Sequence, residues 1–156
     1  MSPVDTVELS PKPANASESH GLGVTELKVT SSAARILIAE DEFLVAILLE
    51  QDVTEAGYSV IGPFTRFPEA LDAVRRGGFD LALLDINMNG QMAYPLAEEL
   101  LTRGVPFIFL SGYGAQDLPE RFRGCSRIAK PYDASTLLRE VARLVGQKGV
   151  DANSAC

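Results

Sequence analysis

Five side chains with reactive or charged groups follow apolar segments of this 156-residue chain. Glu40 and Asp41 come directly after RILIA, Asp85 ends FDLALLD, Ser111 follows VPFIFL, and Lys130 ends SRIAK. An aspartate at the end of an apolar run can be an ordinary turn residue. That reading does not explain why three carboxylates, a hydroxyl and an ammonium group occupy equivalent places.

The segments that carry these residues are typical of buried strands, because they are apolar without polar alternation. Between these strands lie stretches whose apolar residues recur at helical spacing. Predicted strands and helices therefore alternate five times along the chain. We therefore predict an α/β fold with a doubly wound, five-stranded parallel sheet. Asp133 is the expected cap of the last helix, and Pro119 should leave the fourth helix, within 115–124, short or irregular. The predicted strands cover 35–39, 58–62, 79–85, 105–110 and 126–130.

The carboxyl ends of parallel strands meet at one edge of a sheet, so the five side chains should converge. Three carboxylates that lie close together repel one another, and a hard cation such as Mg²⁺ or Mn²⁺ would remove that repulsion. Asp85 could then act as a nucleophile toward a phosphoryl group, with Lys130 and Ser111 contacting its oxygens. The pattern predicts phosphoryl transfer to Asp85.

Together the motifs AED, LLDINM, LSG and AKPY resemble the receiver domain of two-component response regulators, over about residues 34–148. The resemblance implies a flavodoxin-like (βα)5 fold with strand order 2-1-3-4-5. It also implies that Asp85 is the phosphoacceptor and that Glu40 and Asp41 are the acidic metal pair. In the same family the backbone carbonyl at the position of Asn87 completes the metal shell.

By the same resemblance, Ser111 is the Thr/Ser switch residue, and Lys130 belongs to a Lys-Pro pair whose bond to Pro131 is cis. The family accepts phosphoryl groups from a histidine kinase or a histidine phosphotransfer protein. A member without an output domain would signal through contacts with a downstream protein, in a phosphorelay, in stress signalling or as a phosphate sink. We expect this chain to be such a stand-alone receiver and not an enzyme in its own right.

A narrower resemblance lies in PFIFLSGYG, which is similar to the FAT GUY receivers, many of them single-domain proteins of alphaproteobacteria. The chain departs from typical receivers at Arg127, where an aromatic switch residue is usual, and at Asn89, where a proline is usual. The expected switch and partner surface consists of Gly112, Tyr113, Gly114, Arg127 and Pro131. Residues 111–124 are expected to form the segment that changes conformation on phosphorylation.

The rest of the sequence limits the partners. Residues 1–33 and 149–156 are expected to be flexible tails. A net charge of −7 argues against direct binding to nucleic acid or to an anionic membrane, and neither a secretory signal nor a membrane span is visible. We therefore expect a cytoplasmic protein.

Two alternatives are open at this point. A phosphatase of the haloacid dehalogenase type also uses a strand-end aspartate with Mg²⁺, but it needs a second aspartate where this chain has Asn87. A degenerate receiver that serves only as a binding module is the other alternative, and Arg127 is the residue that favours it.

Overall fold

The computed structural model describes residues 32–112 and 118–147. The expected tails lie almost wholly outside the described residues, and so do Tyr113 and Gly114. Within the described part, no helix is long and apolar enough to cross a membrane.

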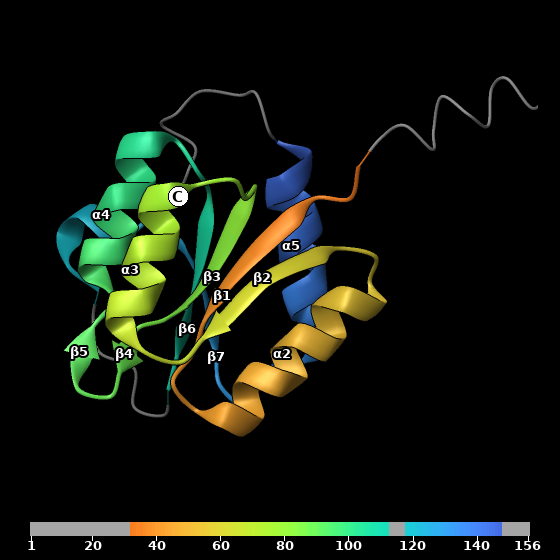
Figure 1. The fold of residues 1–156 in the computed structure, drawn as a ribbon, viewed down its shortest axis with the longest axis horizontal. Coiled ribbons are helices and arrows are strands. Elements are labelled where there is room, and N and C mark those ends of the chain that lie inside the picture. The colour runs from red at the N-terminus through yellow and green to blue at the C-terminus, as the bar shows by residue number, and fades with distance from the viewer. Residues whose placement is uncertain (1–31, 113–117, 148–156) are drawn as a thin grey trace, which may run out of the picture. The chain divides into compact units, whose positions relative to one another are not determined.

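Five strands form one parallel sheet in the order β2-β1-β3-β6-β7 (Figure 1). In chain order this is the predicted 2-1-3-4-5 arrangement, and every neighbouring pair is parallel. The predicted flavodoxin-like fold class is confirmed. The strands are β1 (Arg35–Ala39), β2 (Ser59–Phe64), β3 (Leu81–Asp85), β6 (Phe107–Ser111) and β7 (Ser126–Ala129).

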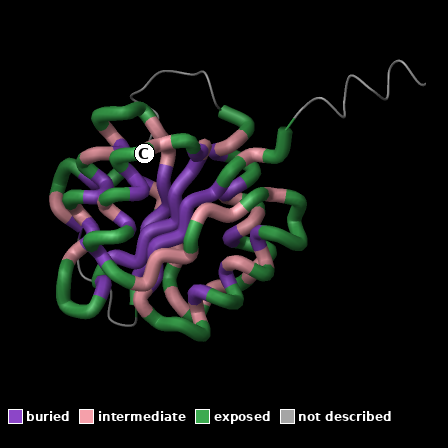
Figure 2. The backbone as a smooth tube through the Cα atoms, viewed as in Figure 1, coloured by how far each residue is buried: buried purple, intermediate pink, exposed green. Residues whose placement is uncertain are grey.

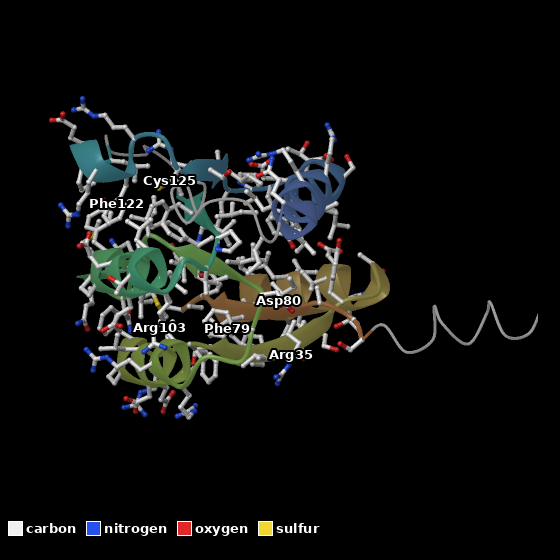
Figure 3. The ribbon with its side chains drawn as sticks, turned by 90° about the horizontal axis from the view of Figure 1, so that it is seen from above. Arg35, Phe79, Asp80, Arg103, Phe122 and Cys125 are labelled. Carbon is white, nitrogen blue, oxygen red and sulfur yellow. The ribbon has the colours of Figure 1, made fainter. Side chains whose placement is uncertain are left out.

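Four α-helices cover the two faces of the sheet in the described part of the chain. Figure 3 views the molecule with α3 and α4 on one side of the sheet, together with Phe122, and α2 and α5 on the other. In place of the expected fourth helix, the described residues after Pro119 form a single 3-10 turn, η2 (Glu120–Phe122). The helices are α2 (Phe43–Glu55), α3 (Phe67–Arg76), α4 (Tyr94–Arg103) and α5 (Ala134–Gly146).

The core is divided by the sheet into two apolar layers, because successive strand residues point to opposite faces. Leu37 and Leu84 pack toward α3 and α4, whereas Ile38 and Leu83 pack toward α2 and α5. The central strands are therefore buried on both sides, as Figure 2 shows. This double burial explains why the strand sequences show no polar alternation.

Local signals fix the ends of several elements. The side chain of Asp133 accepts a hydrogen bond of 2.9 Å from the backbone N–H of Thr136, so the predicted cap of α5 is confirmed. At the opposite end of the sheet, Asp80 accepts a hydrogen bond of 2.8 Å from the backbone N–H of Arg35 (Figure 3). Asp80 thus joins the starts of β1 and β3, far from the strand ends that carry Asp85.

Candidate functional site

The register of the central strands brings the acidic residues together. Ala39 of β1 pairs with Leu84 of β3, so the next residues along, Glu40 and Asp85, lie side by side at the ends of these strands. Carboxylate oxygens of Glu40, Asp41 and Asp85 lie within 4.8 Å of one another. Glu40 and Asp85 are buried, and Asp41 is partly exposed. The predicted convergence of the three acids at one sheet edge is therefore observed.

Glu40 is held by the neighbouring strand as well as by its own. The backbone N–H of Glu40 donates to the carbonyl of Phe64 at the end of β2, over 3.0 Å. The β1–β2 pairing shifts its register between Leu37 and Ala39, just before this contact. Gly62 in the same part of β2 has a φ of +102° and precedes a cis bond to Pro63. The irregular end of β2 thus fixes the backbone from which Glu40 projects.

A short hairpin beyond Asp85 supplies backbone donors to the acids. Its strands are β4 (Asn87–Met88) and β5 (Gln91–Met92), joined by Asn89 and Gly90. The N–H of Asn87 lies 3.2 Å from Asp85 Oδ1, and the N–H of Asn89 lies 2.8 Å from Asp41 Oδ2. The hairpin therefore orients both carboxylates.

The hairpin was missed from the sequence, although a signal for it was present. Asn89 and Gly90 both have positive φ, of 59° and 90°. An Asn-Gly pair is the strongest short-range indication of a two-residue hairpin turn with this geometry. The Asn-Gly pair thus forms the turn that joins β4 to β5.

Lys130 reaches into the cluster from the end of β7. Its Nζ lies 3.0 Å from Glu40 Oε2, 3.3 Å from Asp85 Oδ2 and 3.4 Å from Glu42 Oε1. Burial alone would lower the pKa of Lys130, but the hydrogen bond to Glu40 and the charge of Asp85 raise it on balance. The ammonium group is therefore firmly charged. The bond from Lys130 to Pro131 is cis, as the resemblance implied.

Glu42 is a neighbour of Lys130 that the sequence did not single out. Its backbone N–H donates to Glu40 Oε1 over 3.0 Å, and its own carboxylate is about two-thirds exposed, at 66%. Because its exposed carboxylate lies next to Lys130 and the acidic pair, Glu42 adds a further carboxylate to the approach to Asp85.

Ser111 lies at the end of β6, where it is buried. Its Oγ is the one buried side-chain oxygen or nitrogen in the described residues that makes no hydrogen bond. A buried hydroxyl without a partner costs free energy, so its position calls for an acceptor that is absent here. The backbone carbonyl of Ser111 accepts a hydrogen bond of 2.7 Å from the backbone N–H of Lys130, which follows the neighbouring strand β7.

The expected switch surface is only partly described. Gly112 is exposed directly after Ser111, and Arg127 is exposed on β7, where it pairs in register with Phe109. Pro131 is exposed directly after Lys130. Tyr113 and Gly114 lie outside the described residues, so their part in a switch stays a prediction.

The electrostatics of the cluster favour a bound cation. Burial, together with the neighbouring carboxylates of Asp41 and Glu40, raises the pKa of Asp85 to about 8, and the lowering effect of the Lys130 charge is smaller. Asp85 therefore holds a proton near neutral pH unless positive charge is added. Carboxylate oxygens from three residues, partly open to solvent at Asp41, are the donor chemistry that Mg²⁺ prefers. The residues present fit such a metal.

Comparison with known proteins agrees with this geometry. Residues 36–142 match the family model described as the response regulator receiver domain. Among solved structures, the chain is similar to the solution structure of SdrG from Sphingomonas melonis Fr1, with a TM-score of 0.66 and 34% identity. That similarity covers 74% of this chain and 98% of SdrG.

Two curated relatives span different lengths. The chain is 29% identical over 117 residues to the transcriptional regulatory protein PdtaR of Mycobacterium tuberculosis, which is 72% of this chain but only 57% of PdtaR. It is 24% identical over 119 residues to the sporulation initiation phosphotransferase F of Bacillus subtilis, covering 73% of this chain and 95% of that protein.

Proposed function

Because the chain belongs to the response regulator receiver domain family, we propose that it accepts a phosphoryl group on Asp85. The observation that carries this proposal is the set of groups around that carboxylate. Two acids lie within metal-binding distance of it, Lys130 lies 3.3 Å from it, and the buried hydroxyl of Ser111 lacks a partner. Because the acids, the lysine and the hydroxyl are all present around Asp85, we favour a phosphoacceptor over a degenerate receiver that serves only as a binding module.

In the proposed reaction a carboxylate oxygen of Asp85 attacks the phosphorus of a phosphohistidine. The P–N bond breaks, its electron pair stays on the imidazole, and the imidazole takes up a proton from solvent. Lys130 neutralises one phosphoryl oxygen, and the Ser111 hydroxyl donates a hydrogen bond to another. These groups act through position and charge, so the reaction needs no further acid or base from the protein.

Glu40, Asp41, Asp85 and the backbone carbonyl of Asn87 are the proposed ligands of Mg²⁺ or Mn²⁺. When bound, the cation supplies positive charge that offsets the charge of the carboxylates and of the incoming phosphoryl group. The hydrogen bonds from Asn87 and Asn89 keep Asp85 and Asp41 oriented for this role.

The proposed donor is a cytoplasmic histidine kinase or histidine phosphotransfer protein, and the surface next to the site suits a protein donor. Helix α2 begins two residues after Asp41 and exposes large apolar side chains at its start. Exposed apolar groups that cluster on one helix favour contact with another protein. These side chains are Phe43 (67% exposed), Leu44 (74%), Ile47 (40%) and Leu48 (53%).

We further propose that the domain acts as a stand-alone receiver of the FAT GUY kind and signals through protein contacts. The motif from Pro106 to Gly114 supports the subfamily. Relatives that consist almost wholly of the matched region support the stand-alone role, since the match covers 98% of SdrG and 95% of the Bacillus phosphotransferase.

Incubation with acetyl phosphate and Mg²⁺, followed by intact mass measurement, tests the phosphoacceptor. We expect one phosphoryl group per chain in the wild type and none in Asp85→Asn or in chelator. Incorporation that persists in Asp85→Asn would contradict the proposal, and so would equal incorporation with and without a divalent cation.

A further inference from the structure

Tyr132 lies two residues after Lys130 and is tied to helix α2. Its hydroxyl donates a hydrogen bond of 2.8 Å to Asp52 Oδ2, across 80 residues of sequence. Burial raises the pKa of Tyr132, and the hydrogen bond to Asp52 raises it further, so the phenol keeps the proton that it donates. This contact serves no role in the function proposed above.

In the described part of the chain, the segment that carries Lys130 is attached to the rest of the domain by packing of Tyr132 against the apolar cluster and by hydrogen bonds. The backbone N–H of Lys130 donates to Ser111 of β6, and the side chain of Asp133 caps α5. Between these two points, the hydrogen bond from Tyr132 to Asp52 joins the segment to α2.

A cavity of about 250 Å³ separates much of the segment from α2. It is lined by Val45, Leu48 and Asp52 of α2, and by Lys130, Pro131 and Tyr132 of the segment. Lys130 therefore borders open space on the side that faces α2. Tyr132 and Asp52 both line this cavity, so their hydrogen bond joins the segment to α2 beside it.

We propose that Tyr132 is a positioning residue for phosphoryl transfer, which holds Lys130 over Asp85 through its hydrogen bond to Asp52. The inference rests on the proposed phosphoacceptor function and adds a residue to that site. Tyr132 does not touch the reacting atoms, and it acts by fixing the backbone from which the lysine side chain projects.

Lys130 needs such support because its ammonium group can interact with Glu42 as well as with Asp85. A lysine has a flexible four-carbon stem, and the exposed carboxylate of Glu42 offers its ammonium group a place on the rim, 3.4 Å away. A small displacement of the segment would move the ammonium group from Asp85 toward Glu42. Displacements of about 1 Å can slow a reaction by up to roughly 100-fold when catalysis depends on position.

Four variants of the full chain separate positioning from stability. Tyr132→Phe and Asp52→Leu remove the hydrogen bond, whereas Asp52→Asn keeps an oxygen that can accept it. Tyr58→Phe is the matched control, because Tyr58 packs against the same apolar cluster as Tyr132. For each variant, the rate of phosphoryl incorporation from acetyl phosphate, the Mg²⁺ affinity and the melting temperature are measured.

We expect Tyr132→Phe and Asp52→Leu to slow incorporation by roughly tenfold, with Mg²⁺ affinity unchanged. If the hydrogen bond only stabilised the fold, the acidic residues would shift as well, and its loss would lower both the rate and the Mg²⁺ affinity. The Mg²⁺ affinity therefore separates a positioning role from a purely structural one. Asp52→Asn and Tyr58→Phe should react at the rate of the wild type.

Wild-type rates in Tyr132→Phe and Asp52→Leu would overturn the inference, and so would an equal loss of rate and Mg²⁺ affinity in either. A slow Asp52→Asn beside a fast Tyr132→Phe would also overturn it, because the charge of Asp52 would then matter and the hydrogen bond would not. If the wild type itself takes up no phosphoryl group, the proposed function fails, which is a separate result.

Discussion

The backbone N–H of Lys130 donates a hydrogen bond of 2.7 Å to the backbone carbonyl of Ser111. This contact joins the ends of β6 and β7, so the two side chains proposed to contact the phosphoryl group project from one connected backbone. Movement of Ser111 toward a phosphoryl oxygen would therefore act directly on the segment that carries Lys130.

Removing the hydroxyl of Ser111 should not destabilise the unphosphorylated protein. Because Ser111 Oγ is buried without a partner among the described residues, Ser111→Ala removes a desolvation cost of about 1–3 kcal/mol at most. We expect the melting temperature in chelator to stay equal or rise. A marked fall would mean that the hydroxyl has a partner in solution.

The same variant should lose the response of its neighbours to phosphorylation. With a beryllofluoride mimic and Mg²⁺, amide exchange at Gly112 and in 118–124 should change in the wild type, since the hydroxyl is drawn to the new acceptor. In Ser111→Ala that change should be much smaller. An equal change in both proteins would contradict the proposed switch role of Ser111.

Mg²⁺ affinity should rise with pH. Burial, together with Asp41 and Glu40, raises the pKa of Asp85 to about 8, so below that pH a proton must leave before the carboxylate can bind a cation. The proton and the cation compete, and affinity should fall by up to about tenfold for each pH unit below 8. Titration calorimetry at pH 6.5 and 8.5 measures this.

Asp85→Asn is the control for the pH dependence. The amide cannot carry the competing proton, so the affinity of the variant for Mg²⁺ should be weaker at pH 8.5 and nearly independent of pH. A wild type whose affinity is the same at both pH values would show that Asp85 is already ionised at pH 6.5.

Most of the fold and the core of the site could be predicted because the information is local. Apolar runs such as 79–85 identify buried strands, and in a parallel sheet the residues that end or directly follow these runs must lie at the same edge. That reasoning alone brings Glu40, Asp85 and Lys130 together.

What could not be predicted depends on contacts between distant parts of the chain. No local pattern links Tyr132 to Asp52, and the approach of Glu42 to Lys130 depends on how α2 leaves β1. The hairpin at Asn89 and Gly90, in contrast, could have been predicted, because an Asn-Gly pair is a local signal for a two-residue turn.

Glu42 should slow the reaction with small anionic donors. Its exposed carboxylate stands on the rim of an already acidic site, where charge acts mainly on the rate of encounter. We expect Glu42→Gln to speed phosphorylation by acetyl phosphate by roughly two- to fivefold at low salt. The gain should shrink as ionic strength rises, because salt screens exposed charges.

Glu50 provides a control for the effect of Glu42. It lies on the same helix, and Glu50→Gln changes the net charge of the protein by the same amount. An equal gain in both variants would mean that total charge, not the position of Glu42, governs the rate.

Gly62→Ala should destabilise the protein more than Gly57→Ala, another glycine-to-alanine change at positive φ. A Cβ at Gly62 would lie 2.8 Å from the backbone nitrogen of Phe64 and 2.9 Å from the carbonyl oxygen of Ile38. Gly57 is the matched control, since its φ of +99° is close to the +102° of Gly62 but a Cβ there meets nothing within 4 Å. Gly57→Ala therefore measures the cost of the backbone conformation alone, about 1–2 kcal/mol.

The difference between the two variants isolates the steric effect at the end of β2. We expect Gly62→Ala to lose a further ~1–3 kcal/mol of unfolding free energy in urea titrations. Because Phe64 accepts the N–H of Glu40, the backbone shift that relieves the clash should also weaken Mg²⁺ binding in Gly62→Ala. Gly57→Ala should bind Mg²⁺ as the wild type does. Equal stability of the two variants would show that the added Cβ has no steric cost at the end of β2. Unchanged Mg²⁺ affinity in Gly62→Ala would show that β2 does not position Glu40.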